Sequence, residues 1–326
     1  MTNHYVDGVG GLGLNRMTRQ EVEDMVQKNR TLAREKDGRF KSTKDKREEN
    51  VPKYITEAKL DQWQGQIMKA LQGTEIPIHR YYGKTVRFGV LSDTHIGSLY
   101  ENRELMEIAY DVFLKEGITN VYHCGDITDG EKMYRGQEYE LYAHGADRQI
   151  DAVAERYPYR KGINTYFILG NHDLSFWKHS GNNIGEKISN KRKDLIYVGD
   201  EEVDILVGDK KNNAIIRLLH PHKGSAYAIS YQIQKYIESL SGGQKPKVLL
   251  VGHYHKTEFL PSYRNVLAMQ AGCTQSQTPF MRGRNLAAHT GFWIVELQID
   301  ENNSVRRFKP EFFAHYETAV MTHSTF

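Results

Sequence analysis

Short runs of carboxylate, imidazole and amide side chains recur at five places in this 326-residue chain, and most of them follow a few apolar or β-prone residues. In chain order they are Asp93-Thr94-His95, Gly125-Asp126-Ile127-Thr128-Asp129, Gly170-Asn171-His172-Asp173, the His220 and His222 pair, and Gly252-His253-Tyr254-His255. Each run is therefore predicted to be the loop at the C-terminal end of a strand. Ligands bind at that edge in layered α/β folds, so the five runs are expected to meet there.

The residue types in the first two runs predict a metal site. Residues two apart on an extended segment point to the same side, so Asp93 and His95 are predicted to hold one cation. Asp126 is a carboxylate placed to bridge two cations, whereas Asp129, three residues on, is within reach of a neighbouring imidazole. A pair of divalent cations indicates hydrolysis at phosphorus, because such pairs clamp the attacking and leaving oxygens.

The third and fifth runs add a neutral ligand and further imidazoles. Gly170 permits a tight turn, Asn171 supplies an amide oxygen, and His172 is left free for proton transfer. His253 and His255 repeat the spacing of two residues after an apolar segment. Any one of these runs also fits an ordinary turn or a surface pair, but their coincidence at five strand ends favours a site.

One more imidazole is expected from either His220 or His222. Both follow the predicted strand at 214–219, and Pro221 separates them. His220 is favoured because it lies nearer to that strand, and His222 stays open as the alternative.

Alternating strand-forming and helix-forming segments from residue 84 onward predict a layered α/β sandwich. Strands are expected at 86–91, 120–124, 164–169, near 196, 203–207, 214–219, 248–251, 266–270 and 292–299. Helices are expected at 102–116, 138–156, 184–193 and 226–240. Because the later strands lack helices between them, part of the fold is expected to be antiparallel.

Composition excludes several other classes of protein. No run approaches the roughly 18 apolar residues of a membrane span. Residues 1–5 lack a basic stretch followed by an apolar core, so no secretory signal is expected. Cys124 and Cys273 are the only cysteines, which suits a reducing compartment and predicts a cytoplasmic protein. The net charge of +3 is too small to indicate a polyanionic partner by itself.

Residues 1–80 differ from residues 81–326 in their pattern of residue types and are predicted to form a separate helical, basic extension. Helices are expected at 18–33 and 56–71, on either side of a flexible linker. Between Lys28 and Lys53 there are ten Lys or Arg against five Asp or Glu. The extension is interpreted as a solvated arm packed on the main domain or on a partner subunit, with contact to nucleic acid as the alternative.

The five runs together resemble the calcineurin-like metallophosphoesterases, whose motifs come in the order D-x-H, GD-x-x-D, GNH-D/E, H and GH-x-H. The resemblance covers about 86–299 and implies a four-layer α/β/β/α metallophosphoesterase sandwich. Two segments, 92–98 with 125–130 and 271–280, are similar to the exonuclease subunits of archaeal D-family DNA polymerases. Those subunits carry an OB-type β-domain at the front, whereas residues 1–80 here are predicted to be helical, which favours a stand-alone enzyme.

The resemblance implies two divalent metal ions and the residues that hold them. One ion is assigned to Asp93, His95, Asp126 and His255, and the other to Asp126, Asn171, His220 and His253. Mixed oxygen and nitrogen ligands suit transition metals better than Ca²⁺, so Mn²⁺ is expected first, with Fe, Zn or Ni as alternatives.

The resemblance also implies catalytic roles. His172, oriented by Asp129, would protonate the leaving oxygen or stabilise the developing charge. Phosphate contacts are expected from the cations Arg148, Lys223, Arg282 and Arg284. Aromatic side chains expected to stack bases near the mouth of the site are Tyr227, Phe280 and Trp177. For these cations and aromatics, a solvated surface position or a place in the core is the alternative.

Three functions follow from these expectations. The first is a DNA exonuclease that hydrolyses phosphodiester bonds. The second is a small-molecule phosphodiesterase, for example on cyclic nucleotides, or a phosphomonoesterase, which needs only the metal residues. The third is a non-catalytic scaffold, and the complete set of ligand residues argues against it.

Overall fold

The computed structural model describes residues 77–81, 85–209, 212–224 and 226–316, which lie in the second of two compact units, Met1–Glu75 and Ile76–Phe326. The helices predicted at 18–33 and 56–71, and the basic linker between them, lie outside the described residues. Strand β1, Ile78–Arg80, falls at the end of the predicted extension and pairs in parallel with β6. None of the helices in the described residues is long and apolar enough to cross a membrane.

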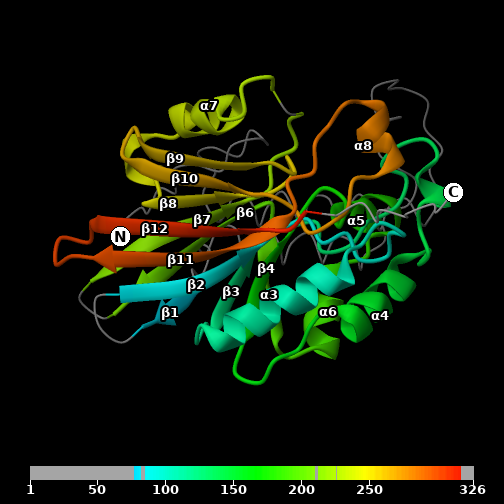
Figure 1. Ribbon diagram of the computed structural model, residues 1–326, viewed down its shortest axis with the longest axis horizontal. Helices are drawn as coiled ribbons and strands as arrows, with labels where there is room; N and C mark the ends of the chain where they lie inside the picture. Colours follow the sequence, from blue (N-terminus) through cyan, green and yellow to red (C-terminus); the bar gives the residue numbers. More distant parts are fainter. Residues whose placement is uncertain (1–76, 82–84, 210–211, 225, 317–326) are drawn as a thin grey trace, which may run out of the picture. The chain divides into compact units, whose positions relative to one another are not determined.

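Two six-stranded sheets form the middle of this unit (Figure 1). The first has the order β12-β11-β2-β3-β4-β5, with bounds Val305–Ala314, Gly291–Ile299, Thr85–Leu91, Asn120–His123, Asn164–Leu169 and Leu195–Asp200. The second has the order β1-β6-β7-β8-β10-β9, where β6 to β10 are Glu202–Gly208, Asn213–Leu219, Val248–Val251, Thr257–Tyr263 and Val266–Ala271. Neighbours β2, β3, β4 and β5 run parallel, whereas β2 with β11, β11 with β12, β6 with β7 and β9 with β10 are antiparallel.

Helices cover the outer faces of both sheets, which completes the expected α/β/β/α sandwich. The first sheet packs against α3, α4, α5 and α6, which span Arg103–Lys115, Ala146–Arg156, Leu174–Ser180 and Ile184–Lys191. The second sheet packs against α7, Tyr231–Ser239. A shorter helix, α8, Pro279–Gly283, and the 3-10 turns Gln137–Tyr139 and Gly242–Gln244 lie in the connecting loops.

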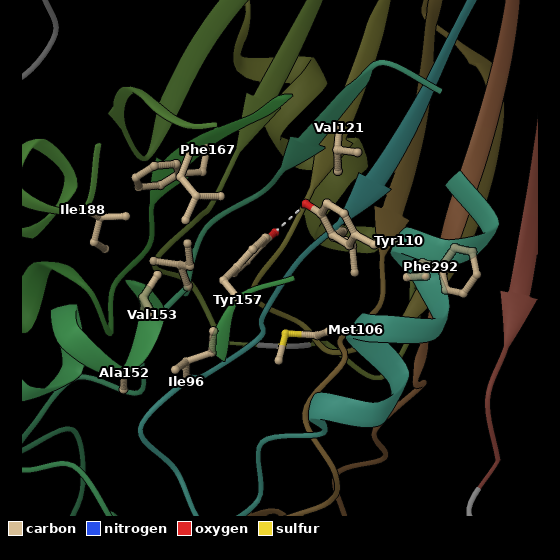
Figure 2. Packing of buried hydrophobic residues seen from close by; sticks show 14 of the residues in the cluster. Ile96, Met106, Tyr110, Val121, Ala152, Val153, Tyr157, Phe167, Ile188 and Phe292 are labelled. Carbon is tan, nitrogen blue, oxygen red and sulfur yellow. Dashed lines mark hydrogen bonds between the residues drawn. The ribbon is translucent and has the colours of Figure 1, made fainter. Parts of the chain in front are cut away.

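The first helical layer is bound to its sheet by a buried apolar cluster that contains large aromatic side chains. Helix α3 begins after Asn102, whose side chain accepts a hydrogen bond from the Leu105 amide and so satisfies one free amide of the first turn. Its buried face includes Tyr110, which meets Tyr157 from the end of α4 (Figure 2). The Tyr110 hydroxyl donates to the Tyr157 hydroxyl at 3.2 Å, so a polar pair is satisfied inside the apolar layer.

Several element predictions need correction. The helix predicted at 138–156 exists only from Ala146, because Gly145 has a φ of 86° and the preceding segment bonds to the loop after β2 through Leu99 N–H to the Glu140 carbonyl. Helix α7 begins at Tyr231 instead of residue 226. Strands β1, β9 and β12 were not predicted, since each lies at a sheet edge, where the apolar pattern is weak.

Candidate metal centre

The metal-type side chains meet where the two sheets place the ends of their strands next to each other. Asp93 and His95 follow β2, Asp126 follows β3, and Asn171 follows β4 in the first sheet. From the second sheet come the residues after β7 and β8, which are His220, His253 and His255. Both sheets therefore contribute to one cluster, and its carboxylates are fully buried.

The first group of ligand atoms lies on the β2 side of the cluster. His95 Nε2 is 3.1 Å from His255 Nε2 and 3.8 Å from Asp93 Oδ1. His255 Nε2 is 3.2 Å from the same Asp93 oxygen, and His95 Nε2 is 3.8 Å from Asp126 Oδ2. Two imidazole nitrogens and two carboxylate oxygens thus surround one point, which is the arrangement a divalent cation requires.

The second group shares Asp126 with the first. His220 Nε2 is 3.1 Å from Asp126 Oδ2 and 3.0 Å from Asn171 Oδ1. One ligand atom each from Asp126, His220 and His253 all lie within 4.8 Å of one another. Asp126 consequently stands between the two groups, where a bridging carboxylate would be.

Hydrogen bonds on the far side of two rings fix which nitrogen faces the cluster. His95 Nδ1 is 2.9 Å from Asp129 Oδ1, and His220 Nδ1 is 2.7 Å from the Cys124 carbonyl oxygen. Since a carboxylate and a carbonyl oxygen accept these bonds, Nδ1 donates in each ring and Nε2 is the nitrogen that faces the cluster. The donor set and its orientation therefore fit divalent transition-metal ions.

The backbone at five of the seven residues has positive φ, in the left-handed region. The values are 53° at Asp93, 46° at His95, 54° at Asp126, 78° at His253 and 52° at His255. The prediction that Asp93 and His95 lie on an extended segment is wrong. Tight turns, tied down by Asp93 N–H to Gly125 O and His95 N–H to Asp126 O, turn both side chains inward. Such backbone costs about 1–3 kcal/mol per residue and is typical of functional sites.

Glycine is required where the strand-end loops crowd His220. A Cβ on Gly170 would lie 2.2 Å from Asp126 Oδ1 and 2.7 Å from His220 Cε1. A Cβ on Gly125, where φ is 95°, would lie 2.4 Å from His220 Nδ1. The glycines in these runs therefore let three loops close around one imidazole.

The carboxylates of the cluster are held ionised by the imidazoles around them. Burial favours the neutral acid, but His255 and His95 hold the pKa of Asp93 well below its usual range. Against the same effect of burial, His220 and His172 lower the pKa of Asp126. In turn Asp126 overcomes burial and raises the pKa of His220 to about 9. The cluster therefore presents two full negative charges to a cation.

His172 and Asp129 lie beside the cluster and contact it differently from what was expected. His172 Nδ1 is 2.6 Å from the backbone carbonyl of Asp129, and 3.9 Å from its carboxylate. The carboxylate instead faces His95. His172 has an atom within 4.8 Å of ligand atoms of His95 and Asp126, and its amide donates to Asp126 Oδ1 at 2.9 Å. Burial lowers the pKa of its imidazole.

Three residues that support the cluster carried no predicted role. Asp173 accepts from the amides of Ile127, Thr128 and Gly170 and so ties the Asp126 loop to the Asn171 loop. Gln137 Nε2 is 3.1 Å from Asp129 Oδ2, and Gln275 Nε2 is 3.2 Å from Asp129 Oδ1.

Two of these three supporting residues lie in segments that the sequence motifs had already marked. Asp173 stands in the Gly170 run, and Gln275 stands in the segment 271–280 singled out by resemblance. Gln137 had no signal, because only the folded loop brings it to Asp129.

The other predicted residues lie outside the cluster, most of them at the surface. His222 is exposed and pairs with Glu201, with 2.6 Å from Nε2 to Oε1, so of the two histidines only His220 reaches the cluster. The four predicted phosphate contacts are all exposed, namely Arg148, Lys223, Arg282 and Arg284. Of the three predicted stacking residues, Tyr227 is fully exposed, Trp177 packs against the helical-layer core and Phe280 stacks on Tyr134.

Residues 86–257 match the family model described as calcineurin-like phosphoesterase. The chain belongs to this family. The matched range runs from β2 to the first residue of β9 and contains all five metal-type runs. Membership makes the protein a phosphoesterase-fold hydrolase of ester bonds, and its Asp and His residues form groups able to hold metal ions.

A curated relative of this phosphoesterase is the DNA polymerase II small subunit of Methanothermobacter thermautotrophicus, 26% identical over 264 residues. The match covers 66% of this chain and 53% of the relative, so the chain spans about half the length of that protein.

Solved structures with similar chains include GAP50, the anchor in the inner membrane complex of Plasmodium, and Yfce, a phosphoesterase from E. coli. GAP50 is 14% identical with a TM-score of 0.44, over 71% of this chain and 85% of that chain. Yfce is 15% identical with a TM-score of 0.35, over 69% of this chain and 98% of that chain.

Proposed function

We propose that this phosphoesterase is a two-metal enzyme that hydrolyses the phosphodiester bonds of DNA, as an exonuclease. The observation that carries the proposal is the convergence of two ligand groups on the shared carboxylate of Asp126, with His220 Nε2 and His95 Nε2 at 3.1 and 3.8 Å from its Oδ2. DNA is favoured as substrate because the curated relative is a DNA polymerase subunit.

Two divalent cations would be held by the seven residues of the cluster, which are Asp93, His95, Asp126, Asn171, His220, His253 and His255. Mn²⁺ is proposed first, because the ligands combine imidazoles with carboxylate and amide oxygens. Such a pair, when bound, acidifies water and neutralises the charge on phosphoryl oxygens.

The protein's own contribution to the reaction centres on His172. The Asp129 carbonyl accepts from Nδ1, so Nε2 is the ring atom that exchanges a proton with the leaving oxygen. Asp129 also orients His95 through its carboxylate, so one residue positions both a ligand and the acid–base group. The edge-to-face packing of the His95 and His172 rings, with centroids 4.6 Å apart, restricts both orientations.

The test is turnover of matched substrates by the purified chain with Mn²⁺. End-labelled single- and double-stranded DNA, a cyclic dinucleotide, an aryl phosphate monoester and bis(p-nitrophenyl) phosphate are incubated in parallel. Progressive shortening of DNA supports the proposal, and its rate should fall as salt rises, because phosphate contacts release counterions. Turnover of only the small substrates contradicts it in favour of the small-molecule function, and silence with Mn²⁺, Fe²⁺, Zn²⁺ and Ni²⁺ favours the scaffold.

A further inference from the structure

We propose that an aromatic shelf beside the metal cluster, made of Leu99, Tyr134, Tyr139, Phe280 and Arg284, stacks the bases of single-stranded DNA next to the reacting phosphate. The shelf would select a polymeric substrate over a small phosphodiester. This inference rests on the proposed nuclease function, and it assigns to that function a binding subsite.

The centre of the shelf is a three-layer stack. The rings of Tyr134 and Phe280 lie 4.2 Å apart between centroids and 21° from parallel. The guanidinium carbon of Arg284 lies 4.6 Å from the centroid of Phe280, so Phe280 is held between the two groups. The Tyr134 hydroxyl donates to Glu140 Oε2 at 2.9 Å. These contacts hold a planar cation at the outer layer, where its face is suited to a base and its edge to a phosphate.

The shelf is tied to the cluster through three chain segments. Gln275, which bonds to the Asp129 carboxylate, precedes Phe280 by five residues, and Asp129 precedes Tyr134 by five. Five residues span at most about 18 Å. At about 3.4 Å per nucleotide of a stacked strand, that distance corresponds to about five nucleotides.

The third segment joins the other side of the shelf to the same loops. Leu99 follows His95 by four residues, and its amide donates to the Glu140 carbonyl at 2.8 Å, which places it against the Tyr139 segment. Helix α8, which carries Phe280, lies at the same end of the two sheets as α5, the helix that begins just after His172 (Figure 1).

Exposure on the shelf is high for side chains of this type. Tyr139 is 81% exposed and Leu99 is 62% exposed, so neither contributes much to the core. Exposed apolar groups that gather beside a charged site are typical of a binding surface. Aromatic groups beside a basic groove are the arrangement that single-stranded nucleic acids bind.

Among the charges around the shelf, which include the carboxylates of Glu138 and Glu140, three arginines suit the phosphates of DNA. Two arginines beside the helical layer have carboxylate partners, since Arg160 pairs with Glu107 and Arg192 pairs with Asp194. By contrast, Arg135, Arg282 and Arg284 are exposed and have no ion-pair partner within the described residues. Unpaired guanidinium groups beside stacked rings are left free for phosphates.

The direct test is the affinity for a fluorescein-labelled dT oligonucleotide, measured by anisotropy on the full chain with Mn²⁺ and again with a chelator that prevents cleavage. We expect Tyr139→Ala to raise Kd about 5- to 150-fold, the range for one stacked base. We expect Arg284→Ala also to reduce the slope of log K against log salt by about 0.7, the share of one phosphate contact. Thermal melts confirm that each variant is folded.

Tyr159→Ala is the matched control, because Tyr159 is 59% exposed just before the amino end of β4, away from the cluster. It should bind the oligonucleotide as the wild type does. Oligonucleotides with one abasic position supply the second arm. Removal of the base at one of these positions should weaken binding to the wild type but not to Tyr139→Ala. In that variant the side chain on which the base would stack is already missing.

Two results separate this inference from the proposed function. If DNA is cleaved but Tyr139→Ala and Arg284→Ala bind as Tyr159→Ala does, the shelf is overturned and the nuclease stands. If the shelf variants and the abasic series behave as expected but no DNA is cleaved, the shelf stands and the nuclease is overturned.

Discussion

The orientation and exposure of single imidazole rings separate the candidate metal ligands of this cluster from its candidate acid–base group. His95 and His220 each place Nδ1 against an acceptor, which leaves Nε2 toward the cluster. His172 places Nδ1 against the Asp129 carbonyl, but its side chain is 17% exposed, compared with 2% for His95. The more open ring is therefore the one a substrate would reach.

Removal of His172 should separate turnover from metal binding. We expect His172→Ala to lower kcat for bis(p-nitrophenyl) phosphate about 10²–10⁴-fold, the usual contribution of one acid–base group, while two metal ions per chain remain. Steady-state kinetics and elemental analysis check the two parts. His222→Ala is the control, because that histidine faces solvent and pairs with Glu201. A kcat equal to the wild type would remove His172 from the mechanism.

Residue types and their order were enough to predict which side chains gather, but not how. The sequence singled out the seven residues that meet, and His220 over His222 because it follows the strand directly. The left-handed backbone at Asp93 and His255 could not be predicted, because a pattern of residue types does not reveal backbone φ angles. Both residues were predicted to lie on extended segments. Gln137 was missed because it begins a 3-10 turn, Gln137–Tyr139, that overlaps the segment predicted as a helix at 138–156.

At the scale of elements, buried strands were predicted well and edge strands poorly. The strands Asn164–Leu169 and Val248–Val251 have the predicted bounds, because each contains a continuous run of buried apolar residues, Phe167–Leu169 in the first and Val248–Val251 in the second. Strand β12, Val305–Ala314, mixes charged residues, aromatic residues and Pro310 at a half-exposed edge and gave no clear period. Strand β1 escaped prediction because it has three residues, and its pairing partner, β6, lies far along the chain.

The docking of β1 should depend on pH through His79. His79 is 8% exposed, its Nδ1 lies 2.8 Å from the Tyr122 hydroxyl, and burial lowers its pKa to about 4. The folded state therefore disfavours the proton that the unfolded chain binds near pH 6.5, so stability present above 6.5 is lost as the pH falls toward 4. Allowing for partial solvent contact, we expect a loss of about 1–2 kcal/mol in the free energy of unfolding.

Urea unfolding at pH 7.5 and 4.5 measures this effect. His79→Phe should be less sensitive to the change in pH than the wild type, because the titrating group is gone while the ring stack on Tyr122 and Tyr166 remains available. His179→Gln, exposed at the end of α5, should lose as much stability as the wild type. Equal pH dependence in wild type and His79→Phe would contradict the assignment.

Across the whole of the described unit, the cluster joins two sheets that otherwise meet through apolar packing and a few hydrogen bonds, such as those from His79 to Tyr122 and from Trp293 to the Ala271 carbonyl. Asp93, Asp126 and Asn171 belong to loops of one sheet, and His220 and His253 to loops of the other. Cations bound there would cross-link the sheets. Metal binding should therefore stabilise the fold as a whole, since a ligand of the native state raises its free energy of unfolding.

We expect Mn²⁺ at a hundred times its Kd to add about 2.7 kcal/mol and to raise Tm by roughly 5–10 °C for a unit of this size. Differential scanning calorimetry with Mn²⁺ and with chelator measures the shift. Asp126→Asn should show little of it, because the shared carboxylate is weakened as a ligand to both ions. A shift of the same size in that variant would place the stabilising metal elsewhere.

The most direct measurement is an anomalous difference map from crystals grown with Mn²⁺. The account predicts two peaks about 3.5–4 Å apart on either side of the Asp126 carboxylate. One ion should be bound by Asp93, His95 and His255, and the other by Asn171, His220 and His253. A single peak, or peaks away from Asp126, would contradict the two-metal centre.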